Sequence, residues 1–237
     1  MRRSFIALVL AASCASAADL VVAAAADFSP ITPDLDKAFS RAANVPLTFT
    51  FASSGALVQQ IQNGAPFDVF LSADENYVRD LIRSGDLYPE ITVYALGRLG
   101  LWSKSGTVKS IDDLKKPEVK HIAIANPGHA PYGVAARKAL ETRGLWTQLQ
   151  PKIVYGENVR QAMQFAETGN ADAVITSWTL LIGRGVLLPA EWHDPIRQSG
   201  GVVKSSKQAM AARQFLQFLT SPDGHKILQA GGLFPPQ

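Results

Sequence analysis

Cysteine is nearly absent from this sequence. Its 237 residues include only one, Cys14, in the N-terminal segment. If that segment is removed, the remaining chain has no thiol, which excludes disulfides, thiolate metal sites and cysteine nucleophiles. Histidines are also few, and His121, His129, His193 and His225 lie without the close spacing of zinc ligands. The sequence therefore gives no support for a zinc site.

Long apolar runs are missing as well. The run from Phe5 to Ala12 is far shorter than the roughly 20 residues that a membrane-spanning helix needs. Arg2 and Arg3 precede it and Ala15-Ser16-Ala17 follows it, an order typical of a secretory signal peptide. We therefore predict a signal peptide over residues 1–17. An alternative is a lipoprotein signal lipidated at Cys14, although the leucine usual three positions earlier is absent.

Neither sign of charge is in excess. Without the predicted signal peptide the chain has 21 basic and 20 acidic residues, a balance of +1 (21 − 20). There is no basic tail, so nucleic acid is not an expected partner. A content of 47% hydrophobic and 18% charged residues is typical of an α/β protein with one large or two small domains.

Short apolar strands alternate with amphipathic helices along most of the chain. We expect strands at residues 20–25, 45–51, 68–72, 99–102, 121–125, 153–154 and 173–175. Helices between them are expected to be capped by Ser29, Asp74 and Ser110, and Ser221 is expected to start the last one. This order predicts parallel-rich sheets in two lobes. Residues 18–97 plus 202–237 form the predicted lobe I, and residues 98–201 form lobe II.

Four turns that lead from a strand into a helix carry small or polar residues. They are Ala26-Asp27, Ser53-Ser54-Gly55, residues 130–133 and residues 156–159. In open α/β sheets, ligands lie beyond the carboxyl ends of the strands, where helix N-termini offer free N–H groups. The turns could therefore converge on an anion. For any one turn taken alone, ordinary helix capping is the more usual explanation.

Longer motifs resemble one family. The chain has AAADF at 24–28, FASSGALVQQIQNGAPFDVFLSAD at 51–74, NPGHAPYGVAARKAL at 126–140, ENVRQAM at 157–163 and QFLQFLTSPDG at 214–224. In this order they resemble the periplasmic molybdate-binding proteins, the solute receptors of ABC importers. The resemblance implies a two-lobed periplasmic binding protein of type II, with a ligand cleft between the lobes. It also implies a monomer that delivers molybdate or tungstate to a membrane permease, without a cofactor or a catalysed reaction.

The resemblance also implies which residues hold the anion. Ser54 matches the family's hydroxyl ligand, while Tyr132 and Val159 match positions that offer backbone N–H groups. Asp27 stands where serine or asparagine is usual, and Thr176 where a tyrosine is usual. We expect the Asp27 carboxylate to cap the helix while its N–H faces the anion; alternatively, it accepts a hydrogen bond from a protonated ligand.

These two departures leave other functions open. One alternative is a receptor for sulfate, phosphate or an organic acid. Another is a lyase or hydrolase that uses Ser54 with His129 and Asp27, which a hydrogen bond between His129 and Ser54 would support. Arg160 lies in the first turn of its helix, and we expect it to pair with Glu157 or a neighbouring acid.

Overall fold

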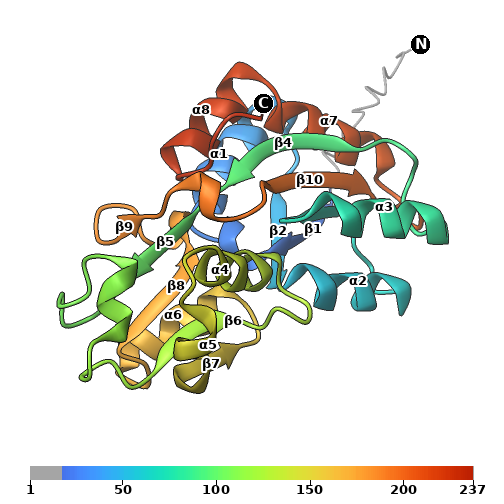
Figure 1. Ribbon diagram of the computed structural model, residues 1–237. Coiled ribbons are helices and arrows are strands. Elements are labelled where there is room, and N and C mark those ends of the chain that lie inside the picture. The colour runs from blue at the N-terminus through green and yellow to red at the C-terminus, as the bar shows by residue number, and fades with distance from the viewer. Residues whose placement is uncertain (1–17, 237) are drawn as a thin grey trace, which may run out of the picture.

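The computed structural model describes residues 18–236, so the predicted signal peptide and Cys14 lie outside the described residues. Two five-stranded sheets form the centres of two lobes that lie against each other (Figure 1). In each sheet, three neighbouring strands pair in parallel, and the other two strands join the sheet by antiparallel pairing. This is the predicted α/β fold with a parallel-rich mixed sheet in each lobe. None of the described helices is long and apolar enough to cross a membrane.

The first sheet has the strand order β2-β1-β3-β10-β4. Its strands are β1 (Leu20–Ala25), β2 (Leu47–Ala52), β3 (Val69–Ser72), β4 (Thr92–Gly97) and β10 (Ile196–Val202). The helices around it are α1 (Thr32–Ala43), α2 (Ser54–Gln62), α3 (Glu75–Ser84), α7 (Ala209–Leu219) and α8 (Pro222–Ala230).

Alternation along β1 explains how this sheet is covered on both faces. Leu20 and Val22 belong to the core shared with α1, α7 and α8, whereas Ala23 belongs to the core shared with α2 and α3. Successive side chains of a strand point to opposite faces, so a strand buried on both sides reads as a continuous apolar run. The C-terminal helices α7 and α8 therefore pack against the first sheet.

The second sheet has the strand order β7-β6-β8-β5-β9. Its strands are β5 (Leu99–Trp102), β6 (Ile122–Ala125), β7 (Ile153–Gly156), β8 (Ala173–Ser177) and β9 (Val186–Leu187). Its α-helices are α4 (Pro131–Thr142), α5 (Trp146–Leu149) and α6 (Val159–Thr168). Ala123 packs with the α6 side, while Ile122 and Ile124 pack with the α4 side.

The capping predictions have mixed outcomes. Asp74 accepts a hydrogen bond from the Asn76 N–H, Ser110 forms a capping box, and Ser221 accepts from the Gly224 N–H, so these three are confirmed. The prediction for Ser29 is wrong. A 3₁₀ turn at Ala26–Phe28 comes first, and α1 begins only at Thr32, without a side-chain cap.

The chain crosses between the sheets twice. It passes from β4 to β5 through Arg98 and returns between β9 and β10. Arg98 joins the two crossings, because its Nη2 donates to the Leu188 carbonyl at 2.7 Å. The predicted lobe boundary between residues 201 and 202 would cut through β10. The whole of β10 belongs to the first sheet, so the chain returns to the first lobe before Ile196. The sequence of β10, IRQSGGV, has no apolar alternation, which is why it was not predicted as a strand.

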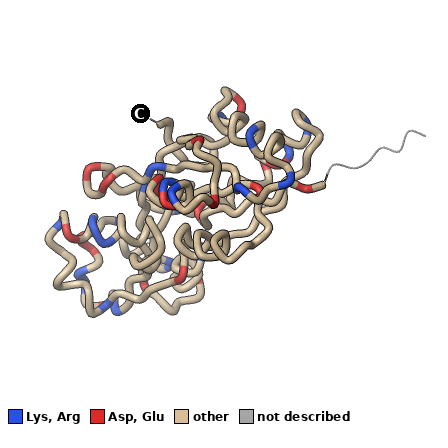
Figure 2. Tube along the Cα trace, turned by 90° about the vertical axis from the view of Figure 1, so that its right-hand side faces the viewer, with Lys and Arg blue, Asp and Glu red and all other residues tan. Residues whose placement is uncertain are grey.

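Charged side chains are distributed over both lobes. Figure 2 shows basic and acidic residues interspersed along the chain. Several pairs are exposed neighbours on one helix, such as Arg137 with Glu141 and Lys115 with Asp112. Exposed pairs of this kind contribute little to stability. Among the described residues, basic and acidic side chains thus occur together in both lobes.

Candidate functional site

A small cavity lies where the two lobes meet. Its free volume is about 10 Å³, close to the space that a single water molecule needs. It is lined by Ala25, Ala26, Asp27, Ala52, Ser53, Ser54, Ala73, Ala130, Pro131, Tyr132, Asn158 and Val159. Residues of both lobes contribute to this wall, and the space between them is small.

Direct contacts hold the lobes together around the cavity. The Gly55 N–H at the start of α2 donates to the His129 carbonyl at 3.0 Å. Ser53 Oγ and His129 Nδ1 lie 2.8 Å apart, and Thr179 Oγ1 donates to the Asp27 carbonyl at 2.7 Å. Residues 25 and 26 also share one apolar core with Val159. The molecule is therefore in a closed arrangement.

The starts of α2, α4 and α6 each bring a backbone donor to the cavity wall. Ser54, Tyr132 and Val159 occupy the first or second position of these helices, where N–H groups have no acceptor within the helix. Within residues 18–236, none of these three N–H groups donates a hydrogen bond. Positive helix-dipole ends and free N–H groups together favour an anion.

The Ser54 side chain adds a further donor. Ser54 is fully buried, and its Oγ accepts a hydrogen bond from the Ala73 N–H at 3.1 Å. Because a hydroxyl has one proton and two acceptor positions, this contact orients the oxygen and leaves its O–H to donate. Ser54 thus has both its backbone and its side-chain donor available at the cavity wall.

Asp27 is buried and does not cap a helix, so the capping expectation is wrong. Its Oδ2 accepts hydrogen bonds from Tyr132 Oη at 3.0 Å and from Gln198 Nε2 at 2.7 Å. Its Oδ1 is buried and has no partner among the described residues. Burial raises the pKa of Asp27 to about 7, although the bonds from Tyr132 and Gln198 oppose the shift.

Thr176 lies behind the cavity and is not part of its wall. It is fully buried, and its Oγ1 donates to the Val159 carbonyl at 3.1 Å. The short side chain therefore contacts the backbone of a wall residue, and any effect of Thr176 on a ligand is indirect. Four of the five site residues expected from the sequence meet at the cavity, and this fifth one supports Val159.

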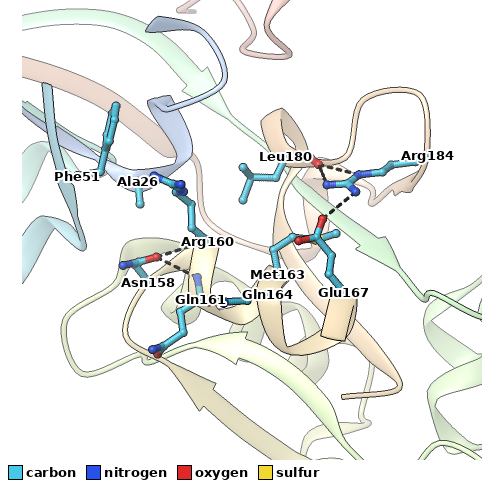
Figure 3. Close-up of a pocket in the computed structure, with 10 residues that line it drawn as sticks. All are labelled: Ala26, Phe51, Asn158, Arg160, Gln161, Met163, Gln164, Glu167, Leu180 and Arg184. Atoms are coloured by element: carbon cyan, nitrogen blue, oxygen red, sulfur yellow. Dashed lines mark hydrogen bonds and ion pairs between the residues drawn. The ribbon is translucent and has the colours of Figure 1, made fainter. Parts of the chain in front are cut away.

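The described residues that line the cavity include no basic side chain. Basic residues occur instead in a larger adjoining cleft, where Arg160 reaches toward Ala26 and Phe51 (Figure 3). The Arg160 guanidinium carbon lies 5.8 Å from the centre of the Phe51 ring, a contact between the lobes. Arg160 does not pair with Glu157, whose Oε2 lies 3.4 Å from His129 Nε2. Arg160 thus stands at the cavity's edge.

The arrangement expected for a hydrolase is not formed. His129 contacts Ser53, whereas Ser54 accepts from a backbone N–H, so the histidine is not placed to take a proton from Ser54. Asp27 is bonded to Tyr132 and Gln198. The residues from 18 to 236 also contain no cluster of metal-ligating side chains.

Several residues around Asp27 were not expected from the sequence. Gln198 lies on β10 and Thr179 follows β8, and both contact Asp27 from more than 150 positions away. Tyr94 Oη donates to Gln198 Oε1 at 3.3 Å, which turns the amide nitrogen toward Asp27. No local pattern marks such contacts, because they depend on how the two sheets meet.

Comparisons with known proteins agree with this arrangement. Residues 20–234 match the family of bacterial extracellular solute-binding proteins. The chain is 34% identical over 226 residues to the molybdate-binding protein ModA of Rhodobacter capsulatus, covering 92% of this chain and 89% of that protein. The periplasmic molybdate-binding protein of Azotobacter vinelandii has a similar structure, with a TM-score of 0.87, 32% identity and coverage of 92% and 100%.

A more distant likeness shows how widely the fold is shared. The sulfate-binding protein SubI of Mycobacterium tuberculosis superimposes with a TM-score of 0.78 at 16% identity, covering 92% of this chain and 87% of that one. At this identity only the fold is comparable. The choice of ligand therefore depends on the cavity wall.

Proposed function

The chain belongs to the family of bacterial extracellular solute-binding proteins, and from this we propose that it captures molybdate or tungstate for an ABC importer. The anion would lie in the small cavity between the lobes and pass from there to a membrane permease. The proposal includes export by the N-terminal signal peptide, with lipidation at Cys14 as the alternative, and a monomeric periplasmic receptor.

The observation that carries the proposal is the set of unused donors at the cavity. The N–H groups of Ser54, Tyr132 and Val159 and the Ser54 hydroxyl come from both lobes. A tetrahedral oxyanion has four oxygens that each need donors, and donors fixed by helix starts need little reorganisation when it binds. An anion bridging both lobes would favour the closed arrangement over an open one.

Neutral donors and helix dipoles would replace a counterion. Each helix N-terminus carries the equivalent of about half a positive charge, so the three starts supply on the order of +1.5 in total. The starts of α2, α4 and α6 all border the cavity. That total is of the size needed to offset a dianion, without an arginine or lysine in the wall.

Other small oxyanions remain the principal alternatives. Sulfate and phosphate have the same tetrahedral shape but are smaller, so a wall spaced for molybdate would leave some of their oxygens without a donor. An organic acid is larger than an inorganic oxyanion, so it would need the lobes to separate further around this small cavity. Phosphate is favoured only if its proton is held by the Asp27 carboxylate, whose Oδ1 has no partner among the described residues.

Thermal unfolding of the purified protein tests the proposal. At a thousandfold excess over its Kd, a ligand stabilises the folded state by about 4 kcal/mol, which raises the melting temperature by about 8 to 16 °C for a chain of this size. We expect that rise with molybdate and tungstate, and a smaller one for Ser54→Ala at the same concentrations. No rise with either anion would refute the proposed ligand.

A further inference from the structure

Asp27 presents a problem for any anion in this cavity. Among the described residues that line the wall, it is the only carboxylic acid and none is basic, and its side chain is almost completely buried. An ionised carboxylate at this place would face the anion's negative charge directly. In a buried site without a cation, that repulsion is only weakly screened.

The hydrogen bonds around Asp27 show which oxygen would carry a proton. Oδ2 already accepts from Tyr132 Oη and Gln198 Nε2. Tyr94 fixes the Gln198 amide in the orientation that donates to Asp27. Oδ1 is buried without a donor or acceptor among residues 18–236, so a proton on Oδ1 displaces no existing bond.

We propose that Asp27 holds the anion in its protonated form, with the Oδ1 hydroxyl donating a hydrogen bond to an anion oxygen. This inference rests on the proposed function. The protonated Asp27 side chain is then a hydrogen-bond donor like the Ser54 hydroxyl. At a pH where Asp27 is ionised in the free protein, the protein must therefore take up a proton when it binds the anion.

The surroundings of Asp27 agree with this role. Tyr132 on α4 and Tyr94 on β4 are the titratable groups described next to it, and burial raises the pKa of both well above the usual tyrosine value. They therefore stay neutral near pH 7. The other contacts come from Gln198 and from the Thr179 hydroxyl, which donates to the Asp27 carbonyl. Burial also raises the pKa of Asp27 itself to about 7, so the proton is available near neutrality.

Calorimetry in buffers of different ionisation enthalpy measures the proton uptake directly. With molybdate as the probe, we expect wild-type uptake to approach one proton per anion at about pH 8 to 9 and to vanish near about pH 5. Affinity should fall about tenfold per pH unit above about pH 7. Asp27→Asn offers an amide donor without a titrating proton, so it should bind with neither proton uptake nor this pH dependence.

Two further variants identify the group that takes the proton. Glu157→Gln removes a carboxylate that is 75% exposed beside the cleft, and uptake should persist in it. Uptake that persists in both Asp27→Asn and His129→Asn would place the proton on the ligand. Uptake that disappears in His129→Asn but not in Asp27→Asn would place it on the histidine. Either result overturns the inference.

If a variant fails to fold, measurements on the wild-type protein alone still test whether Asp27 takes up the proton. Difference infrared spectra should gain a protonated-carboxyl band when molybdate binds at about pH 8, because Asp27 is then converted from the ionised form. Binding without proton uptake and without that band would refute the role of Asp27 and leave the receptor function intact. Absence of any binding would refute both.

Discussion

Gly55→Ala tests whether ligand binding depends on closure of the two lobes. A Cβ at Gly55 would lie 2.9 Å from His129 Cβ and 3.0 Å from the His129 carbonyl oxygen, both on the opposite lobe. It would also lie 3.1 Å from the Tyr77 hydroxyl, at the end of a side chain that can move. The obstruction therefore acts between the lobes and not within α2.

The cost of the added methyl group can be worked out from these contacts. Overpacking of this kind costs about 1 to 3 kcal/mol. Separating the lobes also weakens the hydrogen bond from the Gly55 N–H to His129, worth about 1 kcal/mol. Together these amount to about 2 to 4 kcal/mol, or a Kd for molybdate that is about 30- to 1,000-fold weaker.

Affinity and stability should change in opposite directions in this variant. Alanine is a better helix former than glycine by up to about 1 kcal/mol, so the ligand-free protein should be as stable as the wild type or more so. Titration calorimetry gives the Kd, and solution scattering with saturating molybdate should show less compaction than in the wild type. Gln60→Ala, on an exposed face of the same helix, is the control. An unchanged Kd for Gly55→Ala would refute the closed arrangement as the binding state.

Three other substitutions have distinct expected outcomes. Ser54→Ala should weaken molybdate binding by about 1 to 3 kcal/mol, and because it also leaves the buried Ala73 N–H without its acceptor, it should lower the melting temperature of the ligand-free protein by about 2 to 12 °C. Thr176→Val removes the donor to the Val159 carbonyl, so chemical denaturation should show a loss of about 1 to 3 kcal/mol, with a smaller effect on Kd than Ser54→Ala has. Asp27→Asn should change how stability depends on pH. Because the pKa of Asp27 rises from 3.8 to about 7 on folding, its contribution is fully present below about pH 4 and is lost as pH rises through about 7. Urea denaturation should thus find the ligand-free Asn variant more stable than the wild type above pH 7, by about 4 kcal/mol at most, and equal curves at neutral and acid pH would contradict the shift.

Strands with continuous apolar sequences were predictable, and the others were not. The β1 and β5 strands lie where the sequence placed them, because their apolar runs match burial on both faces. By contrast, β10 is paired on both sides in the first sheet although its sequence is polar and glycine-rich. A methyl group at Gly200 would contact Leu71 at 2.7 Å, so close packing, and not hydrophobicity, accounts for glycine there.

Which helix starts meet at the cavity could be predicted from the sequence, whereas the hydrogen bonds around Asp27 could not. Ser54, Tyr132 and Val159 meet because helix starts gather at the carboxyl ends of parallel strands, and this follows from the order of elements. The environment of Asp27 does not follow from it. That residue depends on Gln198, on a strand that the sequence did not reveal. Thr176 shows the same limit, since a buried hydroxyl on a strand can face the cavity or the backbone behind it.

The central claim is that the cavity between the lobes selects a large tetrahedral oxyanion. The most direct test is calorimetric titration of the protein, beginning near residue 18, with molybdate, tungstate, sulfate and phosphate at neutral pH. We expect tight binding of molybdate and tungstate, with sulfate and phosphate bound more weakly by at least about 3 kcal/mol, which is more than a hundredfold in Kd. Equal or tighter binding of sulfate or phosphate, or no heat with any metal oxyanion, would contradict it.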